Sequence, residues 1–199
     1  TLDFDDTLAT QFTVALPTLD AAGIDARFYA VTDQNGGIGS SSRSMTWDQV
    51  TEIQAHGHEI GSHTRTHPDL TYPCLALSDP NYNASYCAMS NAQRLSAAQA
   101  EIQGSENDLI AHGVTPTTFV YPFGAFNSSV QGLVNSAGFI SARTVYDGYN
   151  YPVSDRFTLL DKHVEGITPP TTVGGVGTPG TTVADVQSWI AQAMASKTW

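Results

Sequence analysis

The sequence predicts an α/β fold in the form of a distorted, incomplete (β/α) barrel built around one sheet. Two observations lead to this prediction. Segments typical of strands alternate with segments typical of helices, and no linker or internal repeat divides the 199 residues. Residues 1–199 are therefore expected to form a single domain with its own core. Because the loops that follow the strands carry the chemistry in such barrels, functional residues are expected there.

The N-terminal part of the chain contains the first expected strands and helices. Apolar residues at helical spacing predict a helix over 9–23. Pro17 is expected either to kink this helix or to delay its start, and Gly23 is expected to end it. Thr46 is a typical N-cap residue for a second helix over 47–55. The strands of this part are expected at 1–6, 27–31 and 58–62.

The C-terminal part continues the alternation. Ser96 and Gln99 have the spacing of a capping box, which predicts a helix running to His112 with Gly113 as its stop. Thr182 is expected to cap a last, amphipathic helix. The remaining strands are expected at 118–121, 139–143 and 157–160, and the remaining helix at 128–137.

Composition argues against several classes of function. The net charge is −11, and such a field repels phosphate backbones and anionic lipid headgroups, so no nucleic-acid partner is expected. No apolar run approaches the roughly 20 residues of a membrane span. The chain opens on Thr1 without an initiator Met, so a processed start is expected.

Two cysteines, Cys74 and Cys87, lie in an expected inserted loop over 71–91. With no other metal ligands nearby, this pair fits a disulfide within the loop better than a zinc knuckle, and two free thiols are the alternative. A disulfide would indicate an oxidising compartment, and hence a secreted or cell-envelope protein. The loop also carries tyrosines, Tyr72 and Tyr86 among them, which either line a substrate groove or pack the loop onto the domain.

Three aspartates end the first expected strand. Asp3 and Asp5 point to one face of the strand, and Asp6 lies near its end. Carboxylates this close repel one another unless a cation lies among them. The segment resembles the nucleophile motif of haloacid dehalogenase-type phosphatases and also the opening motif of polysaccharide deacetylases. A solvated acidic N-terminus is the third interpretation, and this segment alone does not choose among the three.

His63 and His67 have the spacing of a metal-binding pair. Two imidazoles four residues apart can reach one ion from a helical turn or a tight loop, and Pro68 favours the loop. Imidazole suits Zn²⁺, Co²⁺ or Fe²⁺, whereas Mg²⁺ prefers oxygen ligands. The neighbouring His56 and His58 are expected to be structural, because a buried histidine is more often a hydrogen-bonding residue than a ligand.

These motifs together resemble those of carbohydrate esterase family 4, the polysaccharide deacetylases with NodB homology. The resemblance is most specific in residues 3–7, in HGHEIGSHTRTHPDL (56–70) and in TFVYPFGAFN (118–127). It implies a barrel of the NodB-homology type and a metal-dependent hydrolase that removes acetyl groups from an N- or O-acetylated carbohydrate such as chitin, peptidoglycan or another glucosamine polymer. The implied metal is Zn²⁺, with Co²⁺ or Ni²⁺ as alternatives.

The resemblance also assigns roles to individual residues. Asp5 corresponds to the catalytic base, and the metal ligands correspond to Asp6, His63 and His67. The backbone N–H of Phe123 corresponds to the donor that stabilises the oxyanion. One wall of the substrate groove corresponds to Tyr121, Pro122 and Phe123.

The sequence departs from the family pattern at two points. Many members have an arginine at the position of Val120, where it pairs with the base. Arg143 is the candidate replacement here, and a surface ion pair is its alternative role. The Leu-x-His motif of the general acid is also not matched, since Asp161 stands at the leucine position before His163. The general acid and a final strand are therefore expected beyond residue 199, with His163 as the fallback.

Three other functions remain as alternatives. The first is an acetylxylan esterase of the same family. The second is a catalytically silent carbohydrate-binding domain, which the intact Asp-Asp and His-x3-His motifs argue against. The third is a phosphatase in which Asp3 is the nucleophile and Lys162 steadies the phosphate, although no late acidic pair for Mg²⁺ follows.

Overall fold

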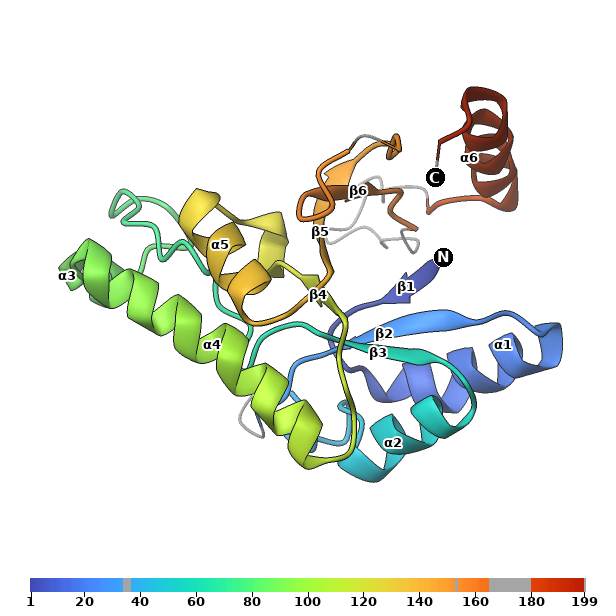
Figure 1. Cartoon of the computed structure of the whole chain (residues 1–199), viewed down its shortest axis with the longest axis horizontal. Coiled ribbons are helices and arrows are strands. Elements are labelled where there is room, and N and C mark those ends of the chain that lie inside the picture. Colours follow the sequence, from blue (N-terminus) through green and yellow to red (C-terminus); the bar gives the residue numbers. More distant parts are fainter. Residues whose placement is uncertain (34–36, 153, 165–179, 199) are drawn as a thin grey trace, which may run out of the picture.

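Six parallel strands form one sheet in the order of the chain, β1-β2-β3-β4-β5-β6, in a computed structural model that describes residues 1–33, 37–152, 154–164 and 180–198 (Figure 1). The strands are β1 (Leu2–Phe4), β2 (Ala26–Ala30), β3 (Glu59–Ser62), β4 (Thr118–Val120), β5 (Ser141–Asp147) and β6 (Leu159–Asp161). Helices connect most of them, and the curled, open sheet is an incomplete barrel. This architecture confirms the predicted fold class.

Apart from the short α3, the helices follow the expected order. The principal ones are α1 (Leu16–Ala22), α2 (Trp47–Ala55), α3 (Ala84–Ala88), α4 (Asn91–Ala111), α5 (Ser128–Ser136) and α6 (Val183–Ser196). A π-helical segment at Gln11–Ala15 precedes α1, immediately before Pro17. The α-helix thus starts late, at Leu16, as one of the two alternatives for Pro17 predicted, because proline has no N–H with which to continue an α-helical ladder from the preceding turn. Gly23 ends α1 in the left-handed conformation, with φ 63°.

The alternation of side chains along the strands separates a charged face of the sheet from an apolar face. The strand register places Asp3, Arg27 and Glu59 in one row across β1, β2 and β3. The next row lies on the opposite face and contains Phe4, Phe28 and Ile60, which belong to a core cluster with α1 and α2. Figure 1 shows both helices along this side of the sheet. A second cluster joins β4 and β5 to α4 and α5.

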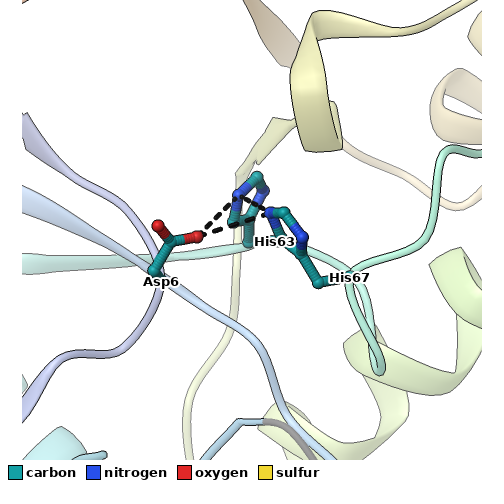
Figure 2. Close-up of side chains that lie close together, drawn as sticks. All are labelled: Asp6, His63 and His67. Carbon is teal, nitrogen blue, oxygen red and sulfur yellow. Dashed lines mark hydrogen bonds and ion pairs between the residues drawn. The ribbon is translucent and has the colours of Figure 1, made fainter. Parts of the chain in front are cut away.

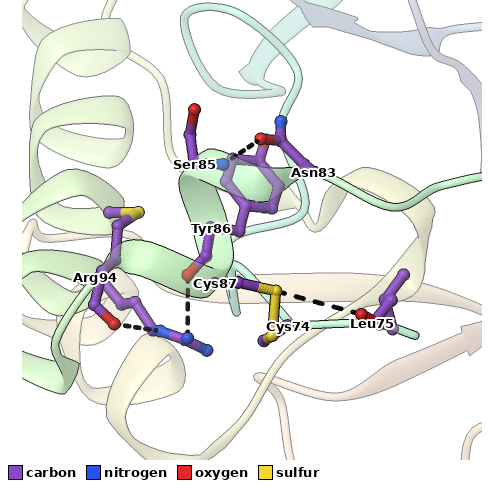
Figure 3. Close-up of a disulfide and its surroundings, with 8 residues drawn as sticks. Cys74, Leu75, Asn83, Ser85, Tyr86, Cys87 and Arg94 are labelled. Atoms are coloured by element: carbon purple, nitrogen blue, oxygen red, sulfur yellow. Dashed lines mark hydrogen bonds between the residues drawn. A yellow bond between two sulfur atoms is a disulfide. The ribbon is translucent and has the colours of Figure 1, made fainter. Parts of the chain in front are cut away.

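The predicted start of the longest helix is wrong. Helix α4 begins at Asn91, and its capping box is formed by Ser90 and Gln93 rather than by Ser96 and Gln99. The sequence repeats the Ser-x-x-Gln pattern six residues apart, and only the outer copy lies at the true helix end. The additional turn of α4 carries Arg94, which donates hydrogen bonds to the carbonyls of Tyr86 and Met89 at the end of α3 (Figure 3).

The inserted loop is closed by a disulfide between Cys74 and Cys87 (Figure 3). The short helix α3, which was not expected from the sequence, carries Cys87. Tyr72 is buried in the second core cluster, and its ring meets that of Tyr86 edge to face with centroids 4.9 Å apart. These two tyrosines therefore pack the loop onto the domain. No helix in the described part of the chain is long and apolar enough to cross a membrane.

We expect the loss of this disulfide to lower the free energy of unfolding by about 2–3 kcal/mol, because the closed loop of 13 residues restricts the unfolded chain. The measurement is urea unfolding of the wild type and of a variant with both Cys74→Ser and Cys87→Ser. A variant that unfolds at the wild-type urea concentration would contradict the prediction.

Candidate metal and catalytic site

Asp6, His63 and His67 converge at the carboxyl ends of β1 and β3 (Figure 2). The Oδ1 atom of Asp6 lies 3.5 Å from Nε2 of His63 and 3.4 Å from Nε2 of His67, and the two Nε2 atoms are 3.0 Å apart. Ligands about 2.05 Å from a tetrahedral zinc ion are separated by about 3.3 Å. The three ligand atoms thus form a triangle of the size of one face of a tetrahedral site, so the residues fit a zinc-type ion.

The orientation of His63 is fixed by a backbone group of the neighbouring strand. Its Nδ1 lies 2.9 Å from the carbonyl oxygen of Val120 at the end of β4. A carbonyl can only accept, so Nδ1 carries the proton and donates it to this bond. The unprotonated Nε2 then faces Asp6, which is the tautomer that a metal ligand requires. His63 is only 3% exposed, so this arrangement is held by packing as well.

The protonation states of Asp6 and His67 also suit metal binding. Burial, followed by the proximity of His63, lowers the pKa of His67. The contact with the imidazole of His63, 3.5 Å away, is the main effect that lowers the pKa of Asp6. Near neutral pH, His67 is therefore a neutral imidazole and Asp6 is an ionised carboxylate, and these are the forms that bind a metal ion.

Left-handed backbone conformations gather around the site. Five non-glycine residues that follow β1, β3 or β4 have positive φ: Asp6 (74°), Thr7 (58°), Thr64 (69°), His67 (60°) and Phe123 (59°). Such a conformation costs about 1–2 kcal/mol for each residue and persists only where the surroundings enforce it. The hydroxyl of Thr7 accepts a hydrogen bond from the N–H of Val31 at 2.8 Å, and that of Thr64 accepts one from the N–H of His67 at 3.0 Å. Both hydroxyls stabilise strained turns that present ligands.

Arg143 on β5 joins three carboxylates beside the metal triangle. Its Nη2 lies 2.6 and 2.8 Å from the two carboxylate oxygens of Asp5. Its Nε donates to Asp3 at 3.1 Å and its Nη1 to Asp161 at 2.7 Å. Burial alone would lower the pKa of Arg143, but Asp5 and Asp3 outweigh it and raise the pKa. The guanidinium therefore stays charged although it is 7% exposed.

The part that Asp161 and Asp3 take in this cluster was not expected from the sequence. Asp161 ends β6, the strand paired with β5, so Arg143 lies within its reach. The signal was present in the sequence, because an acidic residue stands where the family motif has leucine. Burial is the main cause that raises the pKa of Asp3, whose Oδ1 is buried without a hydrogen-bond partner. Asp3 is therefore held beneath Arg143 and is poorly placed to act as a nucleophile.

The expected groove wall is divided between surface and core. Phe123 is 64% exposed, and its ring meets that of His67 edge to face with centroids 4.8 Å apart. Tyr121 is fully buried, at 0% exposure, with its ring packed against Phe119 and Phe126. Pro122 is also buried. The ring of Tyr121 therefore packs in the core, and of the three expected wall residues Phe123 is the one that presents its side chain to solvent.

Three further histidines lie in different surroundings. His56 and His58 contact the carboxylate of Asp20 at 2.7 and 3.3 Å, before the start of β3, which agrees with a structural role. His163 follows β6, on the same end of the sheet as the metal triangle, and its Nδ1 lies 3.3 Å from Asp161. It is therefore linked through Asp161 and Arg143 to the carboxylate cluster.

Comparisons with known proteins concern the family and the fold. The sequence model of the family described as "Polysaccharide deacetylase" matches residues 1–142. A search of curated proteins finds no match. Similar solved structures include the deacetylase PplD of Streptococcus pyogenes, with 19% identity, a TM-score of 0.64 and coverage of 80% of this chain and 61% of that one.

Two further structures show the same likeness. The deacetylase domain of BpsB from Bordetella bronchiseptica has 22% identity, a TM-score of 0.68 and coverage of 80% of this chain and 68% of that one. A polysaccharide deacetylase from Bacillus cereus has 18% identity, a TM-score of 0.66 and coverage of 94% and 50%. At these identities the likeness shows a shared fold, and the chain spans 50–68% of the length of these proteins.

Proposed function

Because the chain belongs to the polysaccharide deacetylase family, we propose that it is a metal-dependent hydrolase that releases acetate from an N- or O-acetylated polysaccharide. The observation that carries this proposal is the triangle formed by Asp6, His63 and His67 next to the carboxylate of Asp5. A glucosamine polymer such as chitin or peptidoglycan is the substrate we favour, and acetylated xylan is the alternative. The disulfide supports a secreted or cell-envelope location.

We assign the metal site to Asp6, His63 and His67. Two imidazoles and one carboxylate suit Zn²⁺, with Co²⁺ or Ni²⁺ as alternatives. Such an ion, when bound, supplies Lewis acidity toward the acetyl carbonyl and makes an attacking water more acidic.

Asp5 would accept the proton of the attacking water. It follows β1 directly beside the proposed ligand Asp6, and Arg143 fixes the orientation of its carboxylate by a two-pronged contact. This arrangement gives Arg143 the positioning role that the arginine of the third family motif has in many relatives. A general base held in one orientation contributes on the order of 10²–10⁴-fold to the rate of such a reaction.

Phe123 would form the wall that faces the reacting acetyl group. Its left-handed conformation turns the chain sharply after Pro122, and its exposed ring lies beside that of His67. The backbone N–H of Phe123 would donate to the developing oxyanion, and the ring offers an apolar surface to the sugar. The proton for the departing group would come from an imidazole, for which His163 is the candidate in the described chain.

Calorimetric titration of chelator-treated protein tests the metal site directly. We expect Zn²⁺ to bind one to one and Mg²⁺ to bind far more weakly. His63→Ala should weaken Zn²⁺ binding by more than about 100-fold, because the loss of a group that only supports a ligand already costs 10–100-fold. His56→Ala, which removes a histidine that contacts Asp20 instead, is the matched control and should bind like the wild type.

Either of two results would overturn the proposal. One is binding of Mg²⁺ alone or of neither ion, and the other is Zn²⁺ binding that His63→Ala leaves unchanged. Tight Zn²⁺ binding would be followed by an assay of acetate release from acetylated glycans. Binding of saccharide without release of acetate would favour the silent carbohydrate-binding alternative.

A further inference from the structure

The turn that separates His63 from His67 is held from outside by helix α4. This turn comprises residues 64–66, and it must direct the two imidazoles to one point although Thr64 within it and His67 directly after it are left-handed. Its carbonyl oxygens pair with the chain after β2, since the N–H of Thr32 donates to Thr64 at 3.1 Å and that of Asp33 donates to Arg65 at 2.8 Å. These bonds fix one side of the turn only.

The N–H groups on the other side of the turn point to one carboxylate, that of Glu101 on α4. Glu101 Oε2 accepts from the N–H of Arg65 at 3.0 Å and from the N–H of Thr66 at 2.8 Å. Glu101 Oε1 accepts from the hydroxyl of Thr66 at 2.8 Å. A carboxylate is suited to this task, because each of its oxygens can accept more than one hydrogen bond.

Further contacts fix the distance between α4 and the turn. Asp108, two helical turns after Glu101, accepts from Arg65 Nε at 3.0 Å and from the hydroxyl of Thr32 at 2.8 Å. A Cβ atom on Gly104 would lie 2.3 Å from Cδ of Arg65, so the Arg65 side chain rests directly on the helix backbone. Residues 101, 104 and 108 share one face of α4. This face of α4 therefore fixes the position of the turn between the two histidines.

We infer that Glu101 is a positioning residue for the metal site: its carboxylate holds the turn between the two histidine ligands in its strained, metal-binding conformation. The inference rests on the proposed metal site and assigns a role to a residue 38 positions from His63 and 34 from His67 in the sequence. Glu101 would not touch the ion or the substrate. Its effect would be to hold the Nε2 atoms of His63 and His67 in their metal-binding positions before the ion binds.

Zinc titration of three variants tests the inference. Glu101→Ala removes all three hydrogen bonds and should weaken Zn²⁺ binding about 10–100-fold, the range for residues that orient metal ligands. Glu101→Gln keeps a side-chain carbonyl that accepts from the two N–H groups, and its NH₂ group can donate to the hydroxyl oxygen of Thr66. Its Zn²⁺ affinity should therefore stay within about threefold of the wild type. Glu106→Ala removes the same charge from the same helix away from the turn and should bind normally.

Amide hydrogen exchange of the metal-free proteins supplies a second readout. The N–H groups of Arg65 and Thr66 should exchange faster in Glu101→Ala than in the wild type and in Glu101→Gln. Two results would overturn this inference but leave the proposed function standing. One is a Glu101→Ala variant with wild-type Zn²⁺ affinity and unchanged amide exchange at Arg65 and Thr66. The other is an equal loss of Zn²⁺ affinity in Glu101→Ala and Glu106→Ala. A wild-type protein that binds no divalent ion would overturn the proposed function and this inference together.

Discussion

Asp5→Asn is expected to lower the rate of acetate release by about 10³-fold, within the 10²–10⁴-fold range that a general base contributes. Asparagine has nearly the same shape and can still accept a hydrogen bond from Arg143, but it cannot take a proton from the attacking water. Because the proposed ligands are Asp6 and the two histidines, Zn²⁺ affinity should stay close to that of the wild type. The measurement is acetate release with zinc-loaded protein, with calorimetry alongside.

The position of Asp5 allows a sharp control for this prediction. Asp48→Asn makes the same chemical change in the first turn of α2, outside the carboxylate cluster, and should leave the rate unchanged. Full activity in Asp5→Asn would contradict the assignment of Asp5 as the general base. A lost rate accompanied by lost zinc binding would mean that Asp5 belongs to the metal site instead.

Much of the fold and the metal triangle could be predicted because their signals are local. Alternating strand and helix patterns gave the element order, and parallel strands bring their carboxyl ends to one edge of the sheet. Asp6 and the His63–His67 pair each follow one of these strands. The four-residue spacing predicts that the two histidines reach one point, and the shared edge of the sheet predicts that Asp6 lies close to them. Resemblance to the family then supplied the chemistry.

Contacts between distant segments were harder to predict. The Arg143–Asp5 contact spans 138 residues, and the sequence supported it only because the usual arginine is absent. The contact between Arg143 and Asp161 depends on the register of β5 against β6, and that of Glu101 with the metal turn depends on how α4 crosses the sheet. Neither is encoded in a short pattern. The burial of the Tyr121 ring was likewise not evident from its place in a motif, because its packing against Phe119 and Phe126 decides it.

Arg143→Met is expected to destabilise the protein at pH 7 by about 3 kcal/mol, at the lower end of the range for breaking a buried ion pair. Methionine fills much of the space, but Asp3, Asp5 and Asp161 then face one another without a counter-charge. The stability of Arg143→Lys should lie between those of the wild type and Arg143→Met, because one ammonium group cannot donate to three carboxylates in the geometry of the guanidinium. Urea unfolding gives the free energies, and Arg156→Met, which replaces an exposed arginine, should change them by less than about 0.5 kcal/mol.

The pH dependence of this loss identifies its cause. Burial already raises the pKa of Asp3 in the wild type, and removal of Arg143 should raise it further. A carboxyl whose pKa is higher in the folded state than in the unfolded state favours folding below its unfolded pKa, and this contribution disappears as the pH rises through the folded pKa. The deficit of Arg143→Met should therefore shrink as the pH is lowered from 7 to 5. A deficit that is equal at both pH values would indicate lost packing rather than uncompensated charge, and wild-type stability at pH 7 would show that the three carboxylates do not need Arg143.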